Sequence, residues 1–255
     1  IIEGRMYDYK NENQVIAEAG YSWNGNDCVY VIEFKQQQVL EQIHTVAENL
    51  VIRETGTELW FWNKNRLIGL VGDQDQGAVS SIMENIHRKI EAKYQTECKI
   101  GIGTFITEEN PVRRSYEDAN TAIMLEEIMD DNTKVMSLQD FPVILQLIVK
   151  DADENFLERI IQSTLGSLIR NDRKKGTALM ETLKVYIACD GNIKETAEQL
   201  YIHRNTMMYR IRQIESSTKR KMSDIKSASD IMTGYYAYRY KLLKNTKQTG
   251  NDCAF

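Results

Sequence analysis

The chain has 255 residues, of which 42% are hydrophobic and 27% charged, and its formal net charge is −5. These values are typical of a soluble globular protein with one large domain or two ordinary ones. The sequence contains no segment near the roughly 18 uncharged apolar residues that a membrane span requires and no secretory signal pattern, so we expect no membrane partner.

The N-terminal end is interpreted as a remnant of recombinant expression. Residues 2–5 have the sequence IEGR, which matches a protease-cleavage linker, and Met6 follows as a junction. We therefore exclude residues 1–6 from the fold argument and expect the chain to be part of a longer protein. Residues 7–26 are polar, with several Asn, and are predicted to form a lead-in linker.

Residues 27–139 alternate between strand-like and helix-like patterns. Short β-branched and aromatic runs predict strands, and apolar residues spaced three and four apart predict amphipathic helices. In chain order we predict a strand at 28–34, a helix at 39–52, a hairpin of 58–62 and 66–71, a helix at 79–94, a strand at 98–105, a helix at 115–129 capped by Ser115, and a strand at 134–138. This order predicts an α/β sandwich, with helices packed on a sheet.

From residue 140 onward the sequence predicts helices alone. The expected helices cover residues 141–150, 154–169, 176–188, 193–200, 204–216 and 228–243. The fold class is therefore α+β, with an α/β domain at 27–139 and an all-α domain at 140–244. The polar residues 245–255 are predicted to be a disordered tail.

The cysteines and histidines are scattered along the chain. They are Cys28, Cys98, Cys189, Cys253, His44, His87 and His203. A zinc site requires ligands at short spacing, which this pattern does not supply. We therefore predict no metal and no cofactor, free thiols, and a reducing, cytoplasmic location.

Positive charge is concentrated near the C-terminus. Residues 201–247 hold eleven Lys and Arg against three acidic residues, a net charge of +8, whereas residues 1–200 carry −12. An acidic body with a basic end is the form that favours a polyanionic partner.

A helix-turn-helix is predicted at 193–216 within this basic region. Asn192 is a good N-cap with Glu195 three residues later, and Ala197 is small enough for two helices to cross closely. In the second helix Met207, Ile211 and Ile214 share one face. The opposite face carries Asn205, Thr206, Tyr209, Arg212 and Gln213.

These outer residues have the chemistry of DNA recognition. Arg pairs with guanine, Asn or Gln with adenine, and hydroxyl groups with phosphate. We therefore predict double-stranded DNA as the partner of this face. The alternative is an ordinary helical hairpin with a solvated polar face.

The region 172–243 resembles the C-terminal DNA-binding region of the PucR/CdaR family of bacterial regulators. The most specific match is the block His203-Arg204-Asn205-Thr206 followed by Tyr209-Arg210, and the turn and second helix also resemble the Fis-type module. The resemblance implies that Arg204, Asn205, Thr206, Tyr209, and Arg210 or Arg212 contact DNA. To these we add His203, Gln213, Lys219, Arg220 and Lys221 as candidate contacts. The last three are a basic cluster where relatives tend to be more apolar.

Residues 28–138 resemble the GGDEF-like domain that precedes the helix-turn-helix in the same family. Its catalytic cousins, the diguanylate cyclases, hold Mg²⁺ and nucleotide phosphates through aspartates and a Gly-Gly-[Asp/Glu]-Glu-Phe hairpin. Here Tyr30 and Ile32 stand at the aspartate positions, and the hairpin turn is Asn63-Lys64-Asn65. The resemblance therefore implies a catalytically inactive domain with a scaffold or dimerisation role, although its hairpin could still hold a ligand.

The sequence thus predicts a bacterial transcription regulator rather than an enzyme. We expect a homodimer that controls an operon for metabolite use, with an unidentified small-molecule effector and RNA polymerase as a candidate partner. The alternative is a nucleotide-binding or diguanylate-cyclase-type enzyme with an incidental helical tail.

Overall fold

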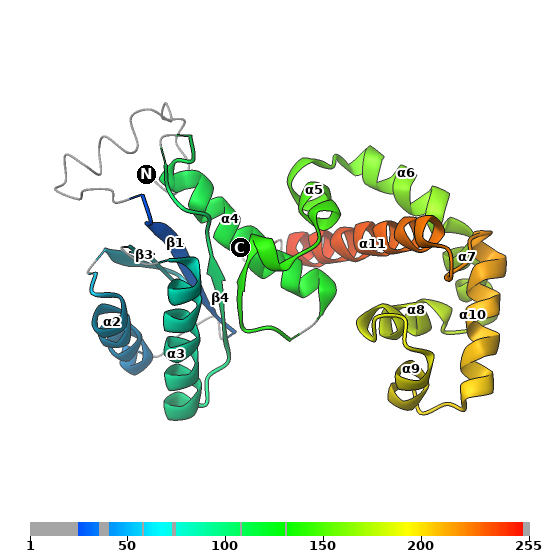
Figure 1. The fold of residues 1–255 in the computed structure, drawn as a ribbon, viewed down its shortest axis with the longest axis horizontal. Coiled ribbons are helices and arrows are strands. Elements are labelled where there is room, and N and C mark those ends of the chain that lie inside the picture. Colours follow the sequence, from blue (N-terminus) through cyan, green and yellow to red (C-terminus); the bar gives the residue numbers. More distant parts are fainter. Residues whose placement is uncertain are drawn as a thin grey trace. The chain divides into compact units, whose positions relative to one another are not determined.

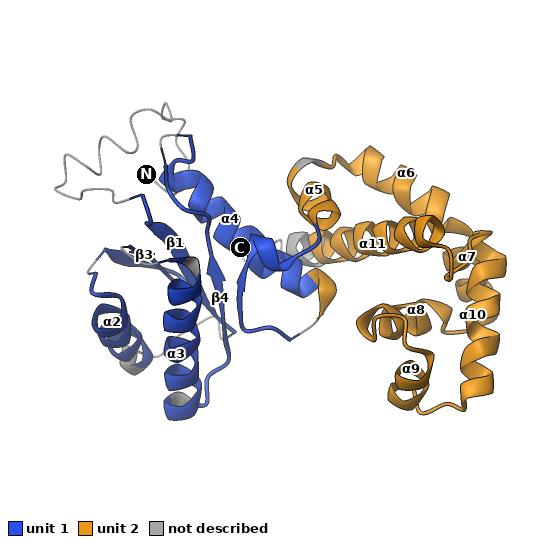
Figure 2. Ribbon diagram, in the orientation of Figure 1, with its two compact units in different colours: residues 1–127, 132–142 blue, residues 128–131, 143–255 orange. Residues whose placement is uncertain are grey.

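The structure is a computed structural model that describes residues 25–35, 41–57, 59–72, 75–107, 109–130 and 132–251. The predicted expression remnant, most of the lead-in linker and the last four residues lie outside these ranges. The chain divides into two compact units (Figure 2). Unit 1 comprises residues 1–127 and 132–142, and unit 2 comprises residues 128–131 and 143–255.

Unit 1 is built on a five-stranded sheet with the strand order β2-β3-β1-β4-β5. The elements are β1 (Cys28–Phe34), α2 (Glu41–Thr55), β2 (Trp60–Asn63), β3 (Arg66–Val71), α3 (Gln76–Tyr94), β4 (Cys98–Ile102), α4 (Val112–Met129), β5 (Val135–Ser137) and the short 3₁₀ turn η1 (Leu138–Asp140). Their order confirms the predicted alternation. The paired strands are antiparallel except for β4 and β5, which are parallel.

The central strand β1 organises the core of unit 1. Tyr30, Ile32 and Phe34 are buried on one face of the sheet with apolar residues of α2 and α3. Gly101 on β4 and Gly103 just after it lie directly against the backbone of α4, where a Cβ atom would collide with the carbonyl oxygens of Ala119 and Ser115. Helices therefore cover both faces of the sheet, whereas the sequence predicted only that helices pack on it (Figure 1).

The predicted cap of α4 is wrong. Helix α4 begins at Val112, directly after Pro111, whose fixed φ suits a helix start. Ser115 lies inside the helix and is buried, and its hydroxyl accepts a hydrogen bond from the Val29 amide (2.9 Å) and donates one to the Thr104 carbonyl (2.6 Å). The hydroxyl therefore ties α4 to β1 instead of capping the helix.

Unit 2 is helical throughout its described residues. It contains α5 (Val143–Asp151), α6 (Glu154–Thr164), α7 (Gly166–Lys175), α8 (Leu179–Ala188), α9 (Ile193–Gln199), α10 (Arg204–Thr218) and α11 (Ile225–Asn251). The long helix α11 supplies much of the core, because Ile231, Tyr235, Tyr236 and Tyr240 are buried. None of the helices in the described part of the chain is long and apolar enough to cross a membrane.

Three predicted boundaries in unit 2 are wrong. The helix expected at 154–169 is interrupted at Leu165, a buried residue whose backbone (φ −115°, ψ −7°) ends α6 and begins α7. Gly176 ends α7 in the left-handed conformation (φ 61°), so α8 begins at Leu179 and not at residue 176. Helix α11 spans Ile225–Asn251 and therefore begins earlier and ends later than the predicted helix at 228–243.

Candidate DNA-binding site

Helices α9 and α10 form the predicted helix-turn-helix. The Asn192 side chain caps α9 by accepting hydrogen bonds from the amides of Lys194 (3.1 Å) and Glu195 (3.3 Å). Ala197 is buried, as its expected place at the helix crossing requires. The local sequence signals for this motif therefore correspond to its geometry.

The turn between the two helices is a Schellman motif. The Ile202 amide donates to the Ala197 carbonyl (2.9 Å), and the Tyr201 amide donates to the Glu198 carbonyl (3.1 Å). Tyr201 occupies the left-handed position of this motif with φ 53°, where glycine is usual, and is 96% exposed. A tyrosine that gains no burial at a position unfavourable to it is a candidate contact that sequence reasoning missed. Its place in the turn directly before the second helix is the signal that could have identified it.

His203 caps the N-terminus of α10. Its Nδ1 atom accepts a hydrogen bond from the Asn205 amide (3.2 Å), and the residue is exposed. Because Nδ1 is an acceptor, the neutral ring carries its proton on Nε2. His203 therefore presents an N–H donor to solvent at a helix end that favours anions.

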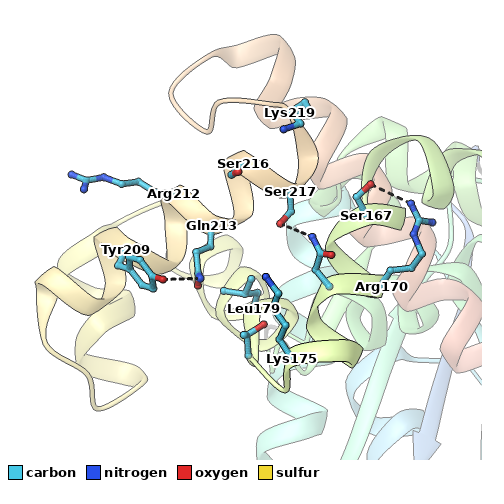
Figure 3. A pocket seen from close by; sticks show the side chains of 12 residues that line it. Ser167, Arg170, Lys175, Leu179, Tyr209, Arg212, Gln213, Ser216, Ser217 and Lys219 are labelled. Atoms are coloured by element: carbon cyan, nitrogen blue, oxygen red, sulfur yellow. Dashed lines mark hydrogen bonds between the residues drawn. The ribbon is translucent and has the colours of Figure 1, made fainter.

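The two faces of α10 match the predicted division. Met207, Ile211, Ile214 and Thr218 are buried, and the opposite side carries the exposed Asn205, Thr206, Tyr209 and Arg212 and the half-buried Gln213. The Gln213 amide nitrogen donates to the Tyr209 hydroxyl oxygen (3.1 Å), so these two side chains form a fixed pair (Figure 3). Arg204, at the start of the helix, is also exposed. The face can therefore present several hydrogen-bonding groups to a partner.

Arg210 points away from this face. Its Nη1 atom donates to the Thr182 hydroxyl on α8 (3.0 Å), and its charge acts on Asp172 of α7. This hydrogen bond gives Arg210 a part in supporting the recognition helix, and the expected contact of Arg210 with DNA stays a prediction. The hydrogen bond depends on angular position, since Arg210 lies on the flank of α10 that faces α8.

Asp172 completes this support. Its carboxylate accepts hydrogen bonds from the Thr177 hydroxyl (2.6 Å) and from the amides of Leu179 (2.8 Å) and Met180 (3.1 Å). Partial burial favours a higher pKa for Asp172, but these hydrogen bonds and the nearby Arg210 charge outweigh it and lower the pKa. Asp172 thus caps α8 from another helix, because the α8 N-cap position, Ala178, has no side-chain acceptor.

The basic cluster after α10 consists of Lys219, Arg220 and Lys221, whose side chains lie in two kinds of surroundings. Lys219 and Lys221 are exposed. Arg220 donates from Nε to the Asp230 carboxylate (3.1 Å) and from Nη1 to the Ser163 carbonyl (3.1 Å). Arg220 therefore ties the segment after α10 to α6 and α11, and its expected role as a phosphate contact stays a prediction.

Unit 1 offers no arrangement of the cyclase type among its described residues. Tyr30 and Ile32 are fully buried, and Glu33 forms an ion pair with Arg66 on the neighbouring strand (2.5 Å). The side-chain Nδ2 of Asn65 donates to the Phe34 carbonyl (2.5 Å), so this residue of the hairpin turn has a structural role. No group of three or more His, Cys, Asp or Glu suited to a metal ion occurs in the described parts of the chain.

The buried thiols of unit 1 are also poor nucleophiles. Burial, with a smaller contribution from Asp27, raises the pKa of Cys28 to about 12. Burial, with a smaller contribution from Glu91, likewise raises the pKa of Cys98 to about 12. Both thiols are protonated at neutral pH, whereas the thiolate is the reactive form.

Comparison with protein families gives two matches that follow the two units. Residues 14–125 match the GGDEF-like domain, and residues 179–237 match the PucR C-terminal helix-turn-helix domain. The second match includes all of α8, α9 and α10.

Curated relatives carry the names of regulators. A "Purine catabolism regulatory protein" of Bacillus subtilis is 27% identical over 58% of this chain and 27% of its own length. A "Proline-responsive transcriptional activator PutR" of the same organism is 26% identical over 73% of this chain and 48% of its own. A "Transcriptional activator PmfR" of Paenarthrobacter nicotinovorans is 40% identical over 31% of this chain and 16% of its own.

The chain thus spans less than half the length of each of these relatives. A solved "Regulator of Polyketide Synthase Expression" from Bifidobacterium adolescentis is 13% identical over 90% of this chain, with a TM-score of 0.35, which is too low to establish a common fold. The two family matches and the regulator relatives agree with the motif at 203–210. The chain therefore contains a match to the GGDEF-like domain followed by a match to the PucR C-terminal helix-turn-helix domain.

Proposed function

We propose that this protein is a sequence-specific, double-stranded-DNA-binding transcription regulator and that α10 is its recognition helix. The observation that carries the proposal is the outer face of α10, where Asn205, Thr206 and Arg212 are exposed while the opposite face is buried in unit 2. Such a helix fits the major groove, which is about 12 Å wide. The names of the relatives support a role in the control of metabolic genes.

The contacts divide into two classes by side-chain chemistry. Arg204, Asn205, Arg212 and Gln213 have the groups that pair with base edges, and Thr206 and Tyr209 can bond either base or phosphate. A second group, placed at the ends of the helix, suits phosphate and comprises Tyr201, His203, Lys219 and Lys221.

The regulator acts as a homodimer in this proposal. One recognition helix contacts only a few base pairs, and two half-sites about 34–36 Å apart multiply the specificity. An unidentified small molecule acts as effector, and RNA polymerase is the partner through which binding changes transcription. This role places the protein in the cytoplasm.

Unit 1 has a non-catalytic role in this proposal. The side chains at the cyclase aspartate positions are Tyr30 and Ile32, which cannot hold Mg²⁺. Phosphoryl transfer of the cyclase type depends on metal-held carboxylates to neutralise charge. We assign unit 1 to positioning or dimerisation.

Two assays on the same preparation test the proposal. The full chain is titrated against a 30-base-pair duplex of random sequence at several salt concentrations, and is then incubated with GTP and Mg²⁺. The proposal predicts affinity that falls steeply as salt rises, with no cyclic dinucleotide product. Absence of salt-dependent binding, or formation of the product, contradicts it.

A further inference from the structure

A polar groove of about 660 Å³ lies along one flank of α10. Its walls are α7, the start of α8, and the α10 surface that carries Tyr209, Gln213 and Ser216 (Figure 3). Four cations line it, Arg170 and Lys175 from α7 and Arg212 and Lys219 from α10 and its end. Neither α7 cation was among the residues predicted to contact DNA.

Within the described residues, no acidic side chain lines this groove or pairs with its cations. The guanidinium of Arg170 donates to neutral acceptors, the Gln162 side-chain oxygen (3.0 Å) and the Ser167 hydroxyl (3.2 Å). The groove is therefore a strip of unpaired positive charge beside the recognition helix.

The two walls are held in register. The Asn171 amide nitrogen on α7 donates to the Ser217 hydroxyl on α10 (3.3 Å). Below this contact, Asp172 of α7 caps α8, and Arg210 of α10 bonds to Thr182 of α8. These contacts consequently hold helix α7, which carries the two cations, in a fixed position relative to α10.

The dimensions of a helix and of the major groove indicate which part of a DNA duplex would contact this flank of α10. A helix of about 10–12 Å diameter fills a major groove about 12 Å wide, so the sugar-phosphate backbones lie along its two flanks. Cations and hydroxyl groups are the side chains that contact phosphate without reading sequence. The groove between α7 and α10, here called the α7–α10 groove, is lined by cations and hydroxyl groups and lies on one of the two flanks of α10.

We propose that the α7–α10 groove holds one sugar-phosphate backbone of the duplex whose bases α10 contacts, with Arg170 and Lys175 as phosphate contacts. The inference rests on the proposed function and extends the DNA interface beyond the helix-turn-helix to α7. All four cations are exposed, which fits a long polyanion neutralised at several points better than a small anion enclosed by buried groups.

Charge-neutral variants of α7 test the inference in the full-length chain. Lys175→Gln and Arg170→Gln each remove one groove cation. Lys174→Gln is the matched control. Lys174 is the neighbour of Lys175, carries the same charge and is exposed, but it does not line the groove. Circular dichroism at 222 nm verifies that each variant is folded.

The measurement is fluorescence anisotropy with a 30-base-pair random-sequence duplex between 50 and 200 mM salt. Each lost phosphate contact reduces the slope of log K against log salt by about 0.9. We expect this reduction, and a several-fold loss of affinity, for Lys175→Gln and Arg170→Gln, a reduction of about 1.8 for the double variant, and the wild-type slope for Lys174→Gln.

The possible failures are distinguishable. If the wild-type chain binds the duplex and both groove variants keep its slope, the inference is wrong and the proposed function stands. If inorganic phosphate binds the wild type, the two groove variants lose that binding, and the DNA slope is unchanged, the groove is a small-anion site and the inference is again wrong. If the wild type does not bind duplex DNA, the proposed function fails and this inference fails with it.

Discussion

Arg204 and Arg210 lie six residues apart on α10 in different surroundings. Arg204 is exposed at the start of the helix, whereas Arg210 donates to Thr182 on α8. The same residue type therefore serves a proposed DNA contact at one position and the support of the helix at the other. Angular position relative to α8 decides between the two roles.

Alanine substitution separates these roles. We expect Arg204→Ala to weaken specific DNA binding by about 1–3 kcal/mol and to leave the free energy of unfolding unchanged. Arg210→Ala should instead lower the free energy of unfolding by about 1–2 kcal/mol, because Thr182 loses its partner and Asp172 loses a nearby positive charge. Urea unfolding and titration of a selected duplex measure both quantities. The assignment is wrong if the two variants exchange these effects.

Asp172 makes a pH-dependent contribution to stability. Its pKa is lowered in the folded chain from the ordinary value of 3.8, so its contribution is present above pH 3.8 and is lost as the pH falls toward the lower folded value. Asp172→Asn removes the carboxylate and part of the α8 cap. We expect it to lower the free energy of unfolding by about 1 kcal/mol at pH 7.

Unfolding of the wild type and Asp172→Asn across pH 7 to 3 measures this contribution. The difference between the two proteins should shrink only below about pH 3.8, because the other carboxylates titrate alike in both. Parallel stability curves down to pH 3 would show that Asp172 does not cap α8 in its charged form.

Sequence pattern predicted the exposed residues of α10 but not the partners of its flanks. The spacing of Met207, Ile211 and Ile214 identifies the buried face and therefore the opposite one. The pairing of Arg210 with Thr182 spans 28 residues, and that of Arg220 with the Ser163 carbonyl spans 57. Helical periodicity carries no information on such pairs, because they depend on how helices pack against one another.

At the scale of elements, the order of helices and strands was predictable and several boundaries were not. Local signals are strong where a hydrophobic period or a turn residue is present, as in β1 and in the hairpin around Lys64. The break at Leu165 is directly followed by Gly166, the first residue of α7, and this glycine is a local signal that the prediction of one continuous helix did not use.

Gly234 allows α11 to approach the end of α6. A Cβ atom at this position would collide with the side chain of Thr164. Alanine is intrinsically favoured over glycine in a helix by about 1 kcal/mol, but relief of this overlap requires the helices to separate. We expect Gly234→Ala to lower the free energy of unfolding by about 1–2 kcal/mol.

Hydrogen exchange of the α6 and α11 amides measures this loss. Gly77→Ala is the control, because Gly77 lies in a helix and its Cβ would meet its nearest neighbour, the Asp75 carboxylate oxygen, at an ordinary 3.4 Å. The Gly77→Ala variant should not increase the exchange of the α6 and α11 amides. Stabilisation by Gly234→Ala equal to that of the control would show that the two helices are not in close contact at Gly234.

At the scale of the whole molecule, positive charge is concentrated in one segment near the C-terminus. The segment 201–247 carries +8 within a chain whose net charge is −5, and the proposed DNA contacts outside α7 lie in it. Unit 1 contains the match to the GGDEF-like domain and has Tyr30 and Ile32 where the resemblance places the aspartates of the cyclases. The sequence predicted this division, whereas the contribution of α7 to the α7–α10 groove required the structure.

The central claim is that the outer face of α10 recognises a DNA sequence. Selection of bound duplexes from a random pool, performed with the wild type and with Asn205→Ala, tests it most directly. We predict that the wild type enriches a defined motif, and that Asn205→Ala loses preference at a single adenine position while retaining salt-dependent affinity. A wild-type pool without an enriched motif, or a variant pool with the same motif, would contradict the account.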